Sequence, residues 1–231
     1  MSLLIEINSI TKHYGRKKVL NDITFSGKPG DCIGIIGSNG CGKSTLLKIL
    51  SGAMRPSHGE ILYNGDNPLL NAKHFSSHIG YVPQDNPLFG NLTVLDNLKL
   101  WYCDSTHNLK DDIENGLIAE FGINKYLKEK VSHLSGGMKK RLSIVCALAK
   151  DPEILILDEP GASLDIIAKN DIINYMKKYI SQGGTILIAS HEEGELSVCN
   201  KKYLMCNGVL TEMESHLSIS AIMERMGNNN A

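Results

Sequence analysis

The sequence lacks several features that would assign a protein quickly to a class. No apolar run approaches the roughly 20 residues that a membrane-spanning helix needs. The start, Met1 to Glu6, has no basic region and too short an apolar stretch for a signal peptide. The six cysteines form no C-x-x-C pair and have no metal-ligand spacing. Small buried thiols in a reducing compartment are therefore expected.

An excess of charge of one sign is also missing. The 24 basic and 25 acidic residues leave a formal net charge of −1, so the sequence offers no electrostatic footprint for nucleic acid. A hydrophobic content of 42% and a charged content of 21% are typical of globular proteins. The 231 residues suffice for one sizeable core with an inserted lobe.

One short stretch carries most of the chemical information. Residues 37–45 fit the phosphate-binding pattern G-x-x-x-x-G-K-[ST]. Its glycines let successive backbone N–H groups point at a phosphate chain, Lys43 supplies a cation, and Ser44 supplies a hydroxyl for Mg²⁺. The predicted nucleotide-binding residues of this loop are Gly37, Ser38, Asn39, Gly40, Cys41, Gly42, Lys43, Ser44 and Thr45.

The segments around this loop have the expected character. Cys32–Ile36 is predicted as a buried strand, and Ser44–Leu50 as a helix whose positive dipole end faces the phosphates. Cys41 lies on the loop itself, so alkylation or oxidation of its thiol is expected to block nucleotide binding. We interpret this as an incidental vulnerability, with a redox-sensing role as the alternative.

Hydrophobic periodicity predicts the order of strands and helices. Alternating residues predict half-buried strands at 5–10, 19–25 and 59–65. Continuous apolar runs predict strands at 32–36, 79–82, 154–157 and 185–189, buried on both faces of a mostly parallel sheet. Helical periodicity predicts helices at 92–101, 111–121, 137–149 and 166–180, and a final hairpin joins 201–206 to 209–212.

Two acids follow the apolar run 154–157. Open α/β sheets bind ligands at the carboxyl ends of their strands. Asp158 can hold Mg²⁺ directly or through water, and Glu159 can polarise a water that attacks the γ-phosphate. The alternative is an exposed acidic turn before Pro160, but the phosphate loop in the same chain favours a site.

A third motif, Leu134-Ser135-Gly136-Gly137, opens a predicted helix and forms another anion-ready N-terminus. With this motif between a phosphate loop and a strand that ends in Asp-Glu, the chain resembles the ATP-binding-cassette (ABC) ATPase family. The resemblance extends from about Leu3 to Leu210. It implies an α/β P-loop NTPase fold, with a RecA-like, mostly parallel core sheet, an antiparallel β subdomain and an inserted α-helical subdomain.

The resemblance also implies a division of one domain, residues 1–231. Residues 1–84 and 151–231 would form the nucleotide-binding core, and residues 85–150 the helical subdomain. Two cassettes would sandwich two ATP molecules head to tail. Ser135, Gly136 and Gly137 would then contact the ATP bound to the partner subunit.

Four further residues match the family pattern. Tyr14 resembles the aromatic residue that stacks on adenine, against the simpler view that it is one tyrosine among eight. Gln84 resembles the glutamine that reaches Mg²⁺ or the attacking water, against a solvated loop amide. Asp165 resembles the loop acid that contacts the opposite subunit. His191 resembles the histidine that senses the γ-phosphate, against a structural histidine.

The implied chemistry is ATP hydrolysis with Mg²⁺. Glu159, His191, Lys43 and Gln84 would be catalytic, and Ser44, Gln84 and Asp158 would hold the metal. The chain departs from the family pattern in the loop that follows Glu159. Gly161-Ala162-Ser163 stands where Thr-Ser-Gly or Thr-Ser-Ala is common, and Ile166 replaces a frequent proline.

Transport would require separate integral membrane permease subunits, with this chain at the cytoplasmic face of the cell membrane. Their docking groove could be formed by an apolar set that could equally be the core of the lobe: Phe89, Leu92, Val94, Leu95, Leu98 and Trp101. The segments 138–141, 192–193 and 199–201 resemble the exporter group, so export is favoured over import.

Two alternatives to transport remain open. One is a soluble ABC ATPase with an assembly role, such as iron–sulfur cluster biogenesis. The other is an ABC protein that acts on ribosomes or DNA, although such proteins normally carry two cassettes, a coiled-coil insertion or a basic patch.

Overall fold

The computed structural model describes residues 4–67, 78–85, 87–105 and 107–213. The strands are β1 (Ile5–Tyr14), β2 (Lys17–Gly27), β3 (Cys32–Ile36), β4 (His58–Tyr63), β5 (Ile79–Val82), β6 (Ile154–Asp158), β7 (Thr185–Ala189), β8 (Lys201–Cys206) and β9 (Val209–Glu212). The helices are α1 (Lys43–Leu50), α3 (Val94–Trp101), α4 (Leu109–Glu114), α5 (Leu117–Glu120), α6 (Gly136–Leu148), α7 (Ile166–Ser181) and α8 (Glu193–Leu196), with 3₁₀ turns η2 (Ile123–Tyr126) and η3 (Val131–His133).

The larger sheet has the order β5-β6-β7-β3-β8-β9. Its strands are parallel except for β9, which pairs with β8 as an antiparallel hairpin. Asn207 and Gly208 form the hairpin turn, and both have the positive φ that this tight turn requires. The mostly parallel core sheet predicted from the apolar runs is therefore confirmed.

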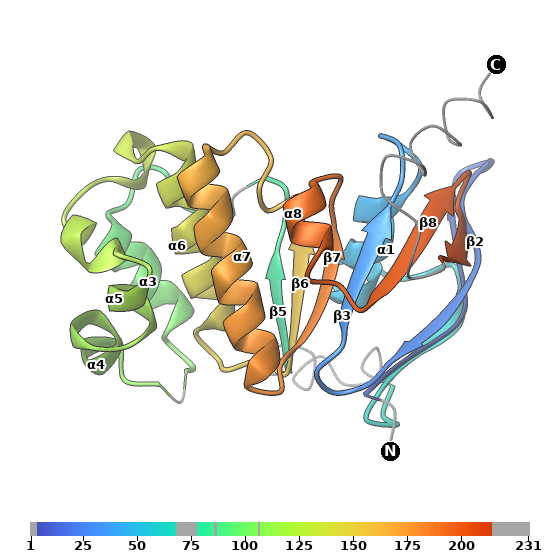
Figure 1. Cartoon of the computed structure of the whole chain (residues 1–231), viewed down its shortest axis with the longest axis horizontal. Helices are drawn as coiled ribbons and strands as arrows, with labels where there is room; N and C mark the ends of the chain where they lie inside the picture. Colours follow the sequence, from blue (N-terminus) through green and yellow to red (C-terminus); the bar gives the residue numbers. More distant parts are fainter. Residues whose placement is uncertain (1–3, 68–77, 86, 106, 214–231) are drawn as a thin grey trace.

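The strands of this sheet are buried on both faces because their side chains alternate between two cores. On β3, Ile33 and Ile35 belong to one hydrophobic cluster while Cys32 and Ile36 belong to the other. The same alternation holds along β6 and β7. In Figure 1 helices α6 and α7 cover one face of the sheet, and α1 covers the other.

A second sheet, β2-β1-β4, is antiparallel and lies beyond α1 in Figure 1. Leu46, Leu47, Ile49 and Leu50 of α1 are fully buried between the two sheets. Strands β1 and β2 are longer than the alternating pattern predicts, because both continue into a hairpin that turns at Gly15. The antiparallel β subdomain is thus present, with α1 as the layer that joins it to the core sheet.

The elements described between β5 and β6 are helices and 3₁₀ turns joined by loops, and α3, α4 and α5 lie at one end of the molecule in Figure 1. The prediction of one helix over 111–121 is wrong, since α4 ends at Glu114 and α5 begins at Leu117. Gly116 marks the break: a Cβ there would lie 2.1 Å from Asp112 Oδ1. No helix in the described part of the chain is long and apolar enough to cross a bilayer.

Candidate functional site

Four neighbouring parallel strands end at the same edge of the core sheet. Gln84 follows β5, Glu159 follows β6, His191 follows β7, and the phosphate loop follows β3. Parallel topology therefore gathers residues that are up to about 150 positions apart in sequence. They line a cavity of about 330 Å³, together with residues from neighbouring segments: Val19, Asn39, Gly40, Gly42, Lys43, Ser44, Thr45, Gln84, Glu159, Ala162 and His191.

The phosphate loop has the geometry of an anion cradle. Gly40 and Gly42 adopt φ of 78° and 118°, which favour glycine because a Cβ would be strained there. A Cβ at Gly37 would lie 2.5 Å from the carbonyl oxygen of Met205. Helix α1 begins at Lys43 with no side-chain cap on its first turn, so the N–H groups there are available to a bound anion.

Lys43 is buried and its ammonium group faces the loop. The Nζ atom donates to the carbonyl oxygens of Gly37 (2.8 Å) and Ser38 (3.3 Å). It also lies 3.7 Å from Glu159 Oε1. These partners compensate for the loss of hydration around the buried cation. The ammonium group is thus held beside the cradle, at the position where it can meet a phosphate oxygen.

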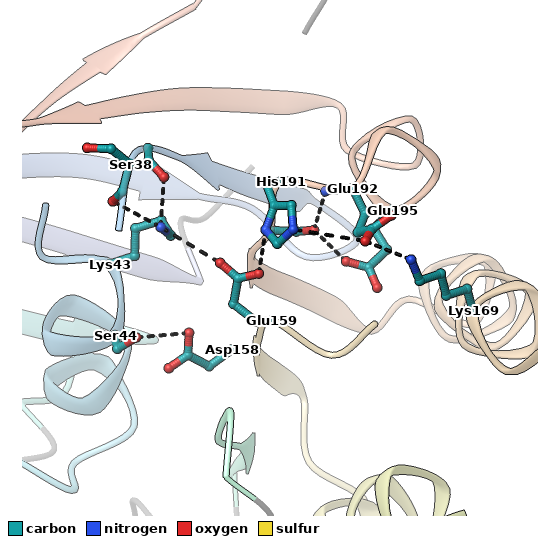
Figure 2. A network of polar contacts seen from close by, with 11 residues as sticks. Ser38, Lys43, Ser44, Asp158, Glu159, Lys169, His191, Glu192 and Glu195 are labelled. Atoms are coloured by element: carbon teal, nitrogen blue, oxygen red, sulfur yellow. Dashed lines mark hydrogen bonds and ion pairs between the residues drawn. The ribbon is translucent and has the colours of Figure 1, made fainter. Parts of the chain in front are cut away.

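Glu159 is the centre of the polar network in Figure 2. Its side chain lies between two basic groups, with Oε1 facing Lys43 and Oε2 2.7 Å from Nδ1 of His191. The residue is 7% exposed. Its backbone adopts φ of 50°, in the left-handed region that residues other than glycine seldom adopt. A buried carboxylate on a strained backbone and next to an exposed histidine has the features of a reaction centre.

Ser44 and Gln84 line the cavity, and Asp158 lies next to Ser44; all three carry oxygen atoms suited to a hard cation. Ser44 Oγ donates to Asp158 Oδ1 at 3.2 Å. Burial raises the pKa of Asp158, and the hydrogen bond from Ser44 opposes that effect. A buried carboxylate with one weak partner fits a site that would receive a divalent cation. Within the described ranges no three His, Cys, Asp or Glu side chains gather into a metal cluster.

The predicted signature residues lie elsewhere. Ser135 caps α6, since its Oγ accepts from the backbone N–H of Met138 at 3.3 Å. Asp165 caps α7 by accepting from the N–H of Ala168 at 2.8 Å. Ser135, Gly137 and Asp165 line a separate cavity of about 200 Å³. One copy of the chain therefore does not bring these residues to its own phosphate loop.

Tyr14 and Cys41 are not among the residues that line the cavity at the phosphate loop. Tyr14 ends β1, is 48% exposed, and donates from its hydroxyl to Met54 Sδ at 3.1 Å. Its ring is accessible for stacking. Cys41 is half-buried, and burial raises the pKa of its thiol. Its thiolate form is therefore disfavoured.

The structure adds polar residues that the sequence motifs did not reveal. Lys140 of α6 is buried and donates to the carbonyl oxygens of Pro83 (3.1 Å) and Gln84 (3.2 Å), and burial lowers its pKa. Lys169 donates to Glu192 at 2.7 Å, and Glu192 lies 4.0 Å from His191 Nε2. No sequence pattern signals Lys140, because its partners lie 56 and 57 positions away.

The six apolar residues that could form either a docking groove or the core of the lobe differ in their burial. Val94 and Leu98 are fully buried in the core, whereas Phe89 and Leu92 are exposed. Next to them lies an apolar groove of about 390 Å³, lined by Ile79, Gly80, Tyr81, Pro83, Pro87, Leu100, Trp101, Asp104, Cys146, Ala147 and Lys150. Trp101 is thus the one member of the set that lines the groove.

Comparison with known proteins places these observations in context. Residues 20–162 match the family model described as ABC transporter. The Nod factor export ATP-binding protein I of Burkholderia orbicola is 37% identical over 83% of this chain and 64% of its own length. This chain therefore spans less than two thirds of that relative.

Other relatives have different printed roles. The spermidine/putrescine import ATP-binding protein PotA of Mycoplasma mycoides is 33% identical over 91% of this chain and 61% of its own length. The linearmycin resistance ATP-binding protein LnrL of Bacillus subtilis is 30% identical over 96% and 76%.

Solved structures show the same fold. The ATP-binding subunit of an ABC transporter superposes with a TM-score of 0.83 at 28% identity, covering 99% of this chain and 95% of that chain. A dimeric ATP-binding cassette in a post-hydrolysis state, bound to ADP and Pi, gives 0.81 at 23% identity, covering 93% and 100%. The predicted P-loop NTPase fold class is confirmed.

Proposed function

This chain belongs to the ABC transporter family of ATP-binding proteins, and from that premise we propose that it hydrolyses ATP to drive transport through separate membrane subunits. The observation that carries the proposal is the placement of Glu159 between Lys43 and His191 beside an uncapped phosphate cradle. Residues 1–84 and 151–231 form the nucleotide-binding core in this proposal, and residues 85–150 present the signature motif.

ATP binding uses the groups already gathered at the cradle. The N–H groups of Gly40, Gly42 and the first turn of α1 receive the phosphate oxygens, and the dipole of α1 favours their negative charge. Lys43 exchanges its loop carbonyls for phosphate oxygens. The exposed ring of Tyr14 stacks on the adenine.

Hydrolysis is assigned to Glu159. Its carboxylate orients a water molecule for in-line attack on the γ-phosphorus. It accepts a proton from that water as the new oxygen–phosphorus bond forms and the bond from the γ-phosphorus to the bridging oxygen breaks, which releases ADP and phosphate. His191, whose Nδ1 lies 2.7 Å from Oε2, fixes the direction of the carboxylate. Lys43 stabilises the charge that develops on the phosphoryl oxygens. A Mg²⁺ ion held by Ser44, Gln84 and Asp158 would neutralise charge on the phosphate oxygens.

The separation of the two half-sites supports pairing with a second copy or a homologous cassette. Ser135 and Gly137 line a different cavity from the one at the phosphate loop, so the signature motif is free to meet the ATP of a partner. Ile166 and Ile167, directly after Asp165, are 78% and 72% exposed. Two adjacent exposed isoleucines next to the signature motif favour a face that a partner covers.

Mixing two inactive variants tests the shared site. Lys43→Ala removes the phosphate cation. Gly136→Asp places a negative charge at the partner's phosphates, and its Cβ has room because the nearest atom is Leu164 Cδ2 at 4.0 Å. Each variant alone should be inactive. Random pairing should restore roughly a quarter of wild-type activity, because half of the dimers carry one intact site of two. No recovery with both variants folded would contradict the shared site.

We propose export as the direction of transport. Two of the relatives are named for export and for resistance, which supports this direction. A third relative is named for import, so import is the competing outcome. The apolar groove around Pro83 and Trp101 would receive a helix of a membrane subunit. That contact would hold the chain at the cytoplasmic face of the membrane.

A pull-down tests this part. The Glu159→Gln variant with ATP is used to capture partners from detergent-solubilised native membranes, with the Leu100→Asp/Trp101→Asp variant as a control for the groove. Capture of a polytopic membrane protein, lost in the control, would support transport, and the topology of that protein would separate export from import. Capture of soluble proteins alone would favour an assembly ATPase.

A further inference from the structure

Glu195 is a carboxyl group buried behind the catalytic residues. It lies on the short helix α8, four positions after His191, and is 1% exposed. The mechanism proposed above does not use it. A fully buried carboxyl costs free energy unless both oxygens have partners, so its retention at this place requires an explanation.

One oxygen of Glu195 is bonded to the residue that precedes His191. Ser190 Oγ and Glu195 Oε2 form a short hydrogen bond, and both residues are buried. Ser190 Oγ also accepts from the backbone N–H of Glu192 at 2.9 Å. The hydroxyl proton of Ser190 is therefore directed at Oε2, which acts as the acceptor. Figure 2 shows Glu195 close to the Glu159–His191 pair.

The other oxygen, Oε1, has no hydrogen-bond partner among the residues that the structure describes. It lies against Gly161, because a Cβ at that position would be 2.3 Å from Oε1. Gly161 comes two positions after Glu159 in the same loop. The carboxyl group thus occupies the space that a side chain at position 161 would need, and it touches both of the loops that carry the catalytic pair.

We propose that Glu195 is a positioning residue for ATP hydrolysis, which holds the loop of Glu159 and the loop of His191 in register through Gly161 and Ser190. The inference rests on the proposed hydrolysis and identifies a residue on which its geometry depends. Glu159 and His191 come from strands β6 and β7, and their 2.7 Å contact requires both loops to be placed to within a few tenths of an ångström.

The protonation of Glu195 matters for this role. Burial raises its pKa, and the hydrogen bond from Ser190 opposes the effect. The charged groups that act on Glu195 are Glu192, Glu159 and Lys169, with Lys140 on the α6 side. Ionisation at higher pH leaves a buried charge with one hydrogen bond, which should loosen the contact.

A double-mutant cycle tests the positioning role. Glu195→Ala should lower kcat roughly 10-fold or more with KM for ATP unchanged, because misplacement acts on the chemical step. Gly161→Ala should lower kcat in the native background, where its Cβ meets Oε1. In the Glu195→Ala background the added methyl group has space, so Gly161→Ala should cost nothing further. Glu193→Ala, on the exposed side of the same helix, is the matched control and should leave kcat unchanged.

The conservative variant Glu195→Gln supplies a second measurement if Glu195→Ala fails to fold. It should keep kcat within about 3-fold of wild type, since an amide preserves the shape of the carboxyl group. It should also change the dependence of kcat on pH, because the amide removes the titration of Glu195. Additive losses in the cycle, a change in KM alone, or superimposable pH profiles would overturn the role of Glu195. A wild-type chain that binds ATP without hydrolysing it would instead overturn the proposed function.

Discussion

The Glu159→Gln substitution is the sharpest test of the reaction centre. The amide has the shape of the carboxylate but neither its charge nor its basicity. It removes the ion pair with Lys43 at 3.7 Å and changes the partner of His191 Nδ1 at 2.7 Å. The side chain is almost fully buried, so solvent cannot replace the lost base. ATP binding should persist, because the variant also removes a negative charge from beside the γ-phosphate.

The size of the effect follows from the role assigned to the carboxylate. A positioned general base contributes about 10² to 10⁴ in rate, which corresponds to about 2.7–5.4 kcal/mol of activation free energy at 1.36 kcal/mol per decade. We therefore expect kcat to fall at least ~10²-fold while the dissociation constant for ATP stays equal or decreases. The dimer with ATP bound should accumulate, because hydrolysis no longer separates the two copies.

Three measurements on one preparation check this expectation: phosphate release under saturating ATP, equilibrium binding of ATP, and size-exclusion chromatography with and without ATP. Glu192→Gln is the matched control, because Glu192 is also near His191 but pairs with Lys169. It should retain kcat within about 3-fold, as expected for a partly exposed ion pair. Near-normal hydrolysis by Glu159→Gln would refute the role of Glu159. An equal fall in kcat in Glu159→Gln and Glu192→Gln would show that the effect is not specific to Glu159.

Three further predictions concern other parts of the site. Lys43→Ala should weaken ATP binding at least ~30-fold, as expected for loss of a buried charged partner, and an unchanged affinity by calorimetry would contradict the assigned contact. Asp31 accepts hydrogen bonds from Lys201 (2.9 Å), Asn200 (2.8 Å) and the N–H of Lys28 (2.8 Å). Against the effect of burial, these bonds lower its pKa below 3.8. Its stabilisation should be present above that value and be lost as pH falls through the lowered pKa. Asp31→Asn should therefore flatten the acid limb of urea-unfolding free energy against pH, and an unchanged limb would exclude Asp31 as its origin. Iodoacetamide should modify Cys41 more slowly than the exposed Cys103 and Cys206, as mass spectrometry would show, and equal rates would contradict the burial effect.

The chemistry of the site could be predicted because the residues of each motif lie within a few positions of one another in the sequence. The phosphate loop must place its glycines and Lys43 within a few positions of one another, and Asp158 with Glu159 must directly follow an apolar strand. These requirements are visible in a sequence without knowledge of the fold. The mostly parallel order of the core strands followed from the apolar runs for the same reason.

The remaining features depend on contacts between distant segments. Glu195 and Lys140 resemble ordinary helix-surface residues in the sequence, and only the packing of α8 and α6 against other loops makes them buried. The break between α4 and α5 depends on a close approach to Asp112 that the apolar periodicity of 111–121 does not encode. The residues predicted to form a docking groove did not share one environment. Phe89 is exposed and Val94 is buried, because the cover over each side chain comes from neighbouring segments that the local pattern does not specify.

The left-handed backbone at Glu159 places folding and chemistry in conflict at one position. A residue without a β-carbon would relax the strain there, which costs of the order of 1–2 kcal/mol for other residues. Glu159→Gly should therefore give a chain that withstands heat better and is inactive. Libraries selected only for thermal tolerance would be expected to enrich this loss of activity, so any search for a more robust variant must score turnover together with melting.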